Sequence, residues 1–195
     1  MPRVSEDHLN ARREQILAAA RTCFLRNGIH NTSMQDLIQE AGLSVGAVYR
    51  YFKSKTEIIN AISQTFTGTI TAGLTQVSDD PELGLRDAMS RALDLVDAQV
   101  APGGMFPLGI QVWGEALRDP AIAEIVKARY SEMRTPFVAL ARRAVERGEL
   151  PPGTDPEAVA SVLFGSLPGY ALQHTLIGTP DKATYLAGLH ALLAR

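Results

Sequence analysis

The sequence predicts an all-α protein with a small N-terminal helical domain, residues 1–55, and a larger helical domain, residues 56–195. Apolar residues recur about every 3.6 residues along nearly the whole chain, the spacing of one face of an amphipathic helix. Gly, Pro and capping side chains divide the chain into segments of helical length. The alternating pattern of strands is nearly absent. Together these observations favour helices that pack on helices.

The composition is that of a globular protein without a membrane span. The chain has 195 residues, of which 46% are hydrophobic and 21% are charged, and it contains no run of 18 or more apolar residues. The first ten residues are polar and do not resemble a secretory signal, so we expect a cytoplasmic protein. The single cysteine, Cys23, cannot form an internal disulfide; we expect it in the core, with a redox-sensing thiol as the alternative.

Charge is distributed unevenly along the chain. Residues 1–55 carry eight Lys or Arg and five Asp or Glu, whereas residues 56–195 carry eleven and sixteen. A basic N-terminal domain on an acidic body suggests that this domain contacts a polyanion such as nucleic acid.

The N-terminal domain is predicted to contain three helices. The first covers Leu9–Asn27 and ends at Gly28, which suits the left-handed conformation that often follows a helix. Two short helices follow over Ser33–Glu40 and Val45–Tyr51. The residues expected to cap the N-termini of the two short helices are Thr32 and Ser44.

The two short helices have the spacing of a helix-turn-helix. They are joined by Ala41–Ser44, and Gly42 can adopt the positive φ that the sharp turn requires. The N-terminal end of the second helix of such a motif enters the major groove of DNA, and small side chains there let its backbone approach the bases. Hydroxyls, lysines and helix N-termini suit phosphates. The candidate DNA-binding residues are Thr32, Ser33, Ser44, Val45, Gly46, Ala47, Tyr49, Arg50, Tyr51, Lys53 and Lys55. The alternative is a generic helical hairpin with a solvated face.

The remainder of the chain is also predicted to be helical. Ser54–Glu57 has the pattern of a capping box and opens a long helix that reaches about Gln76. Further helices are predicted over Glu82–Val100, Phe106–Arg118, Pro120–Arg147, Pro156–Ile177 and Asp181–Ala194. The caps expected before prolines are Asp119, Asp155 and Thr179. Pro136 and Pro168 lie inside helical patterns and should kink or break their helices.

At its N-terminal domain the chain resembles the TetR family of bacterial repressors. The resemblance covers residues 12–57 and is carried by Arg13–Leu17, Ala19, Ala20, Phe24, Gly28, Ala41–Ser44, Gly46, Val48–Tyr49 and Tyr51–Lys55. The chain departs from the family at Ile38, where alanine is usual, and at Val45 and Ala47, where polar residues are frequent. Direct hydrogen-bonded readout should therefore be sparse, with methyl contacts and DNA shape contributing more. Arg50 is the best candidate for a guanine or phosphate contact.

The resemblance implies that the last two long helices form a homodimer interface. Small residues alternate there with larger apolar ones, which lets helices approach closely. The residues concerned are Ala158, Ala160, Ser161, Leu163, Phe164, Gly165, Ser166, Leu167, Gly169, Ala171, Leu186, Ala187, Gly188, Leu189, Ala191 and Leu192. An intramolecular core is the alternative. A two-fold dimer would bind a palindromic operator with half-sites ~34 Å or a multiple apart.

The resemblance also implies a ligand pocket in the middle helices. A pocket needs apolar walls and a few polar groups. The candidate ligand-binding residues are Phe66, Met105, Phe106, Gln111, Trp113, Glu115, Met133, Phe137, Tyr170 and His174. Ordinary core packing is the alternative for each of them.

The predicted function is that of a ligand-responsive transcriptional regulator, expected to be a repressor. It should bind double-stranded operator DNA as a homodimer and be released by a small, largely apolar effector. The alternatives are a ligand-independent DNA-binding protein of the same fold and, more remotely, a protein-interaction module. The chain contains no Gly-rich phosphate loop and no HExxH, CxxC or GxSxG motif, and its four histidines lack metal-ligand spacing. We therefore expect no catalytic site, cofactor or metal.

Overall fold

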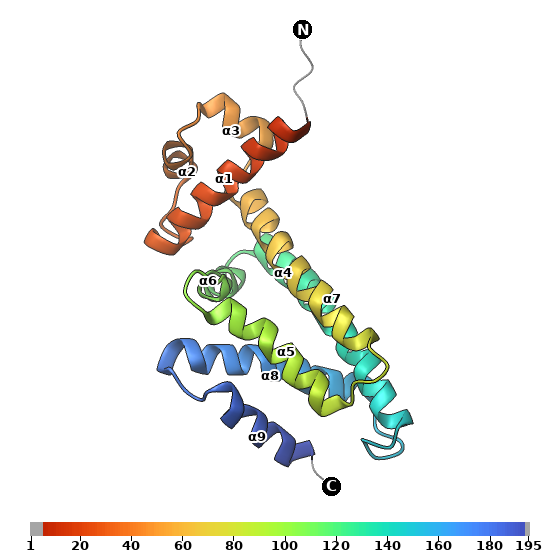
Figure 1. Ribbon diagram of the computed structural model, residues 1–195. Helices are drawn as coiled ribbons and strands as arrows, with labels where there is room; N and C mark the ends of the chain where they lie inside the picture. Colours follow the sequence, from red (N-terminus) through yellow and green to blue (C-terminus); the bar gives the residue numbers. More distant parts are fainter. Residues whose placement is uncertain (1–5, 194–195) are drawn as a thin grey trace. The chain divides into compact units, whose positions relative to one another are not determined.

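The computed structural model describes residues 6–193, and every regular element in this range is an α-helix, as predicted (Figure 1). The helices are α1 (Glu6–Asn27), α2 (Met34–Ala41), α3 (Val45–Tyr51), α4 (Lys55–Asp79), α5 (Leu85–Val100), α6 (Phe106–Ala116), α7 (Pro120–Glu146), α8 (Pro156–Ile177) and α9 (Lys182–Leu193). None of them is long and apolar enough to cross a membrane. Half of the polar N-terminal segment and the predicted helix end at Ala194 lie outside the described residues.

The helix ends follow the capping predictions only in part. Asp119 and Asp155 cap as expected: their carboxylate oxygens accept hydrogen bonds from the N–H groups two residues later, at 2.8 and 3.0 Å. The prediction of a cap at Thr179 is wrong, because α9 begins at Lys182 and Asp181 accepts from the N–H of Thr184 at 2.7 Å. The helices α7 and α8 continue through the internal prolines predicted to kink or break them, so neither proline breaks its helix.

The chain forms two compact units. The segment Pro107–Lys127 packs with the N-terminal part of the chain up to Thr65, and Phe66–Phe106 packs with the chain from Ala128 onward. Most of α6 therefore belongs with the N-terminal helices, although it lies in the second of the two contiguous domains expected from the sequence. The sequence could not indicate this because the residues concerned are distant along the chain.

The first unit is built around α1, on which α2 packs (Figure 1). Its core includes side chains from each of the first three helices that are fully buried, among them Leu17, Leu37 and Val48. The side-chain N–H of Gln15 in α1 donates to the carbonyl oxygen of Ala41 at 2.8 Å, which ties α1 to the end of α2. Gly42 has the predicted positive φ, 63°, and turns the chain toward α3.

The second unit has one apolar core formed by α4, α5, α7 and α8. Both α8 and α9 pack against α5. The hydroxyl of the buried Tyr170 donates to Asp97 Oδ1 at 2.6 Å, and burial together with this hydrogen bond raises the pKa of Tyr170.

The helix α8 has two apolar sides, only one of which faces this core. Some of its residues predicted to lie in a dimer interface are instead buried within their own unit, as the alternative of an intramolecular core foresaw: Ala160, Leu163, Phe164, Leu167 and Ala171. The opposite side of the helix is exposed and includes Val162 and Leu176.

Candidate nucleic-acid interface

The N-terminal end of α3 presents small side chains to the solvent. Ser44 is the N-cap, and its hydroxyl oxygen accepts a hydrogen bond from the N–H of Ala47 at 3.3 Å. Val45, the first residue of the helix, is 61% exposed, and Gly46 beside it is also exposed. The backbone here is therefore open to close approach by a partner, as a helix that enters the major groove requires.

The opposite side of α3 is anchored in the first unit. Val48 is fully buried and Phe52, directly after the helix, is only 4% exposed. The guanidinium of Arg13 in α1 lies 5.5 Å from the centroid of the Phe52 ring, within the range of a cation–π contact. The candidate residues left on the outward side or its edge are Tyr49 and Arg50, both exposed, and Tyr51, which is half-buried.

The N-terminus of α2 is capped by Ser33 and not, as predicted, by Thr32. The N-cap is Ser33, whose hydroxyl oxygen accepts from the N–H of Asp36 at 3.2 Å, while Asp36 Oδ2 accepts from the N–H of Ser33 at 2.7 Å. The hydroxyl and backbone N–H of Ser33 lower the pKa of Asp36. Thr32 is only 1% exposed, and its hydroxyl donates to the carbonyl oxygen of Gly28 at 2.7 Å. Thr32 is therefore not the cap, and its hydroxyl is engaged within the turn, whereas Ser33 is exposed; the predicted DNA contacts of both residues stay predictions.

The two lysines after α3 differ in their surroundings. Lys53 is exposed, and its ammonium group contacts the carbonyl oxygen of Tyr49 at the end of α3. Lys55 is half-buried and donates to carbonyl oxygens of the turn between α1 and α2, at 2.8 Å to Ile29 and 2.9 Å to Thr32. The ammonium group of Lys55 is therefore engaged by that turn in the DNA-free structure, and its predicted phosphate contact stays a prediction.

The predicted capping box before α4 is only half formed. The hydroxyl oxygen of Ser54 accepts from the N–H of Glu57 at 3.2 Å, as the motif requires. The carboxylate of Glu57, however, accepts from the N–H of Lys53 at 2.7 Å and not from that of Ser54. This contact orients the backbone immediately before α4.

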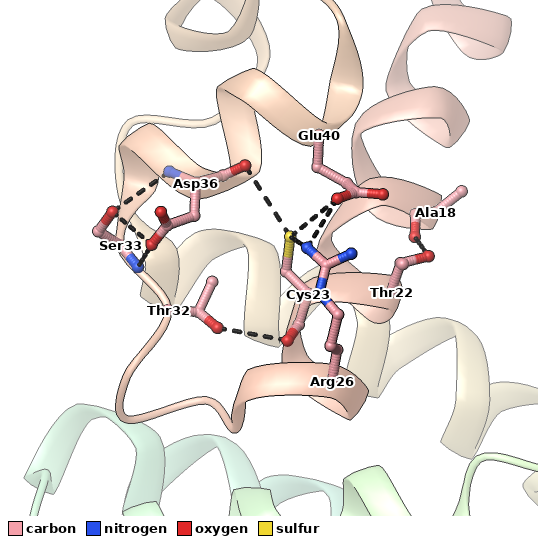
Figure 2. A network of polar contacts seen from close by, with 8 residues as sticks. All are labelled: Ala18, Thr22, Cys23, Arg26, Thr32, Ser33, Asp36 and Glu40. Atoms are coloured by element: carbon pink, nitrogen blue, oxygen red, sulfur yellow. Dashed lines mark hydrogen bonds and ion pairs between the residues drawn. The ribbon is translucent and has the colours of Figure 1, made fainter.

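Cys23 lies in a polar network between α1 and α2, which Figure 2 shows. Its side chain is fully buried, and Sγ is 3.9 Å from the carbonyl oxygen of Asp36 and from Glu40 Oε2. Arg26 pairs with the same carboxylate of Glu40 at 2.8 Å. Burial, followed by the charge of Glu40, raises the pKa of Cys23, so the thiol stays protonated at neutral pH and is a poor nucleophile. These properties favour the core interpretation over the redox alternative.

The ten candidate ligand-binding residues do not share one unit. Seven belong to the second unit, where Phe106, Met133, Phe137 and Tyr170 are buried and Phe66, Met105 and His174 are half-buried. The ring of Tyr170 lies 5.9 Å from that of His174 and 5.1 Å from that of Tyr185, measured between centroids. Their role as ligand contacts stays a prediction.

The other three candidates, Gln111, Trp113 and Glu115, lie in the part of α6 that packs in the first unit. Oε1 of Gln111 accepts from the N–H of Ile29 at 2.9 Å, and Oε1 of Glu115 lies 3.7 Å from Nδ1 of His30. The polar atoms of Gln111 and Glu115 thus face the turn between α1 and α2, and their role as the polar groups of a ligand pocket stays a prediction.

This turn, residues 28–33, brings together side chains whose contacts the sequence did not predict. Its partners are 82 residues away in the case of Gln111 and 26 residues away in the case of Lys55. No local periodicity connects such positions. The one signal available was a lysine at the start of a long helix, and that signal suits a phosphate contact equally well.

Comparisons with known proteins identify both parts of the chain. Residues 16–62 match the family described as bacterial regulatory proteins, tetR family, and residues 85–189 match the tetracyclin repressor-like C-terminal domain. The uncharacterized HTH-type transcriptional regulator YfiR of Bacillus subtilis is 26% identical over an alignment that covers 93% of this chain and 88% of YfiR.

Solved structures share the fold. Salmonella enterica GusR superposes with a TM-score of 0.80 at 24% identity, covering 98% of this chain and 97% of GusR. SmeT, the repressor of a Stenotrophomonas maltophilia multidrug efflux pump, is known in complex with triclosan. That complex superposes with a TM-score of 0.72 at 23% identity, covering 93% of this chain and 91% of SmeT.

Proposed function

Because the chain belongs to the tetR family of bacterial regulatory proteins, we propose that it is a repressor that binds a palindromic operator as a homodimer and is released by a small, largely apolar effector. The family consists of transcriptional regulators, so the chain is a DNA-binding regulator and not an enzyme. The partner DNA, the symmetry of the complex and the effector are the proposed parts. A regulator of this kind works beside the chromosome, in the cytoplasm.

The observation that carries the proposal is the exposed start of α3. Val45 is 61% exposed although Val48, one turn later, is fully buried, so the helix is anchored on one side and open on the other. The methyl groups of Val45 and Ala47 suit contacts with the thymine methyl in the major groove. Arg50 on the outward side can donate to a guanine or a phosphate.

The outer sides of α8 and α9 support the proposed homodimer. Val162, Leu176 and Ile177 are 70%, 67% and 68% exposed on α8, and Leu192 on α9 is 86% exposed. Small residues on the exposed side of α8, including Gly165, permit close approach of another helix. Exposed apolar surface of this kind marks a site of association with a partner. Two copies joined there would match a two-fold symmetric operator.

The proposed effector would act by a shift in population. The effector would bind better to a conformation in which the distance between the two α3 helices does not match successive major grooves. Operator affinity must then fall by the same factor by which DNA weakens effector binding. Such couplings are roughly 5- to 150-fold. The complex of SmeT with triclosan supports a small organic effector for this chain as well. The helix α4, which begins in the first unit and ends in the second, would carry the change.

Fluorescence anisotropy tests the proposal. A labelled duplex from upstream of the protein's own gene is titrated with protein at two salt concentrations, with unlabelled random duplex as competitor. We expect binding that survives the competitor with two subunits per site, and a salt dependence from the phosphate contacts. No binding to any duplex at low salt would contradict the proposal. If operator binding is tight but no small molecule from a broad apolar set weakens it, the ligand-independent alternative is favoured.

A further inference from the structure

The turn between α1 and α2, residues 28–33, is unusually well fixed for a surface connection. Ile29 and Thr32 within it are 2% and 1% exposed, and Gly28 adopts a φ of +84°. The turn forms its own hydrogen bonds, from the N–H of Thr32 to the carbonyl of Ile29 at 3.3 Å and from the hydroxyl of Thr32 to the carbonyl of Gly28 at 2.7 Å. Buried backbone groups need partners, and the remaining ones come from other helices.

The carbonyl side of the turn is held by α4. The ammonium group of Lys55, the first residue of α4, donates to the carbonyl oxygens of Ile29 at 2.8 Å, Thr32 at 2.9 Å and His30 at 3.5 Å. Hydrogen bonds from a charged donor are stronger than those between neutral groups. One side chain therefore links three carbonyl groups of the turn to the start of α4.

The amide side of the turn is held by α6. Oε1 of Gln111 accepts from the N–H of Ile29 at 2.9 Å. Glu115, one helical turn further along α6, places its carboxylate 3.7 Å from Nδ1 of His30. The side chain of His30 is 72% exposed, so this contact contributes little, and the hydrogen bond of Gln111 is the main polar link. The Ile29 residue is thus held at its N–H by α6 and at its carbonyl by α4.

We propose that Gln111 is a positioning residue for DNA binding: it fixes the turn that leads into α2 and so sets the affinity of the α2–α3 pair for DNA without touching it. The turn ends at Ser33, the N-cap of α2, and only the Gly42 turn separates α2 from α3. Displacement of α6 therefore removes the partner of the Ile29 N–H and changes the start of α2. This inference rests on the proposed operator binding.

Three variants test the role of Gln111. Gln111→Leu keeps the side chain's approximate size but removes the acceptor, whereas Gln111→Glu retains an oxygen that can accept from the Ile29 N–H. Gln76→Leu, at an exposed position of α4 in the second unit, is the matched control for a surface Gln-to-Leu change. The measurements are hydrogen exchange of the Ile29 amide in the full-length protein without DNA, and operator affinity at several salt concentrations.

We expect Gln111→Leu to speed exchange at Ile29 and to lower operator affinity about 3- to 10-fold, the effect of one neutral hydrogen bond. The slope of log affinity against log salt concentration should not change, because no phosphate contact is lost. Gln111→Glu and Gln76→Leu should behave like the wild type. Unchanged exchange at Ile29 in Gln111→Leu would overturn the inference, and so would faster exchange with unaltered operator affinity. If the wild type itself binds no DNA, the proposed function fails, and the exchange experiment still decides whether Gln111 holds the turn.

Discussion

Two exposed apolar surfaces of the molecule differ in what surrounds them. Val45 at the start of α3 and Val162 on α8 are 61% and 70% exposed, which is nearly the same. Val45, however, has small and polar neighbours, Ser44 and Gly46, and the other large hydrophobic side chain exposed on α3, Tyr49, carries a hydroxyl. On α8 and α9, by contrast, several large apolar side chains are exposed: Val162, Leu172, Leu176, Ile177 and Leu192.

This difference indicates two kinds of partner. A single valine beside polar groups suits the major groove, where methyl contacts accompany hydrogen bonds to base edges and phosphates. The exposed apolar residues of α8 lie in a stretch, Val162–Ile177, that contains no Asp, Glu, Lys or Arg. Such a surface resembles the centre of a protein–protein interface, from which charged residues are largely absent. Equal exposure of an apolar side chain therefore indicates a different kind of partner in each unit. Two matched substitutions test this difference.

The largest effect is expected from Val162→Asp. A charge in the proposed interface would be buried without a partner, so the dimer should dissociate at concentrations at which the wild type is dimeric. Operator affinity should then fall by about 10²- to 10⁴-fold, because the two DNA-reading units no longer bind as one molecule. Sedimentation velocity measures the first effect and anisotropy the second. A variant that stays dimeric would remove α8 from the proposed interface.

Val45→Asp is the matched change in the first unit and should give the opposite pattern. The dimer should persist, while operator affinity falls about 10- to 100-fold, the size of one lost specific base contact. The added negative charge also repels the phosphates. The same two measurements apply. If Val45→Asp alters the oligomeric state but not DNA binding, the assignment of the two surfaces must be reversed.

The two units also differ in how far the sequence could predict them. The limits of α3, the left-handed Gly42 and the cap at Ser44 were predicted correctly, because each depends on residues within a few positions of one another. In contrast, α8 is apolar on both sides, so periodicity could not separate the buried Leu163 from the exposed Val162.

Three residues of the candidate site form contacts that the sequence did not predict, and these contacts have a common physical origin. Thr32, Lys55 and Gln111 were each predicted to bind an external partner, DNA or ligand, and in the structure each bonds to the backbone of residues 28–33. A polar side chain has the same appearance in a sequence whether it binds a ligand or satisfies a buried backbone group. Only the tertiary arrangement of α4 and α6 decides between the two.

Two lysine variants test which positive charges of the first unit contact the DNA phosphates. Lys53→Met should reduce the slope of log affinity against log salt concentration by about 0.9, because an exposed ammonium group near the phosphates is lost. Lys55→Met should leave this slope unchanged and instead lower stability by roughly 1.5–3 kcal/mol, the worth of hydrogen bonds from a charged donor. That loss corresponds to a decrease in Tm of about 2–4 °C per kcal/mol.

Anisotropy at several salt concentrations and thermal unfolding distinguish the two lysines. Each variant serves as the control for the other, since both remove one positive charge at the same end of α4. If Lys55→Met reduces the salt dependence at unchanged Tm, its ammonium group contacts phosphate in the complex and the prediction from the sequence is confirmed.

The smallest effect is expected from Tyr49→Phe. Tyr49 is 38% exposed on the outward side of α3, so its hydroxyl can donate to one phosphate, and its loss should weaken operator binding about 2- to 10-fold. The matched variant in the second unit is Tyr185→Phe, which removes a hydroxyl that donates to the carbonyl of Ser166 at 2.7 Å. Because that bond lies within the second unit, Tyr185→Phe should lower Tm without altering operator affinity. Equal affinities for Tyr49→Phe and the wild type would restrict the DNA-reading surface to the side of α3 that Val45 and Arg50 define.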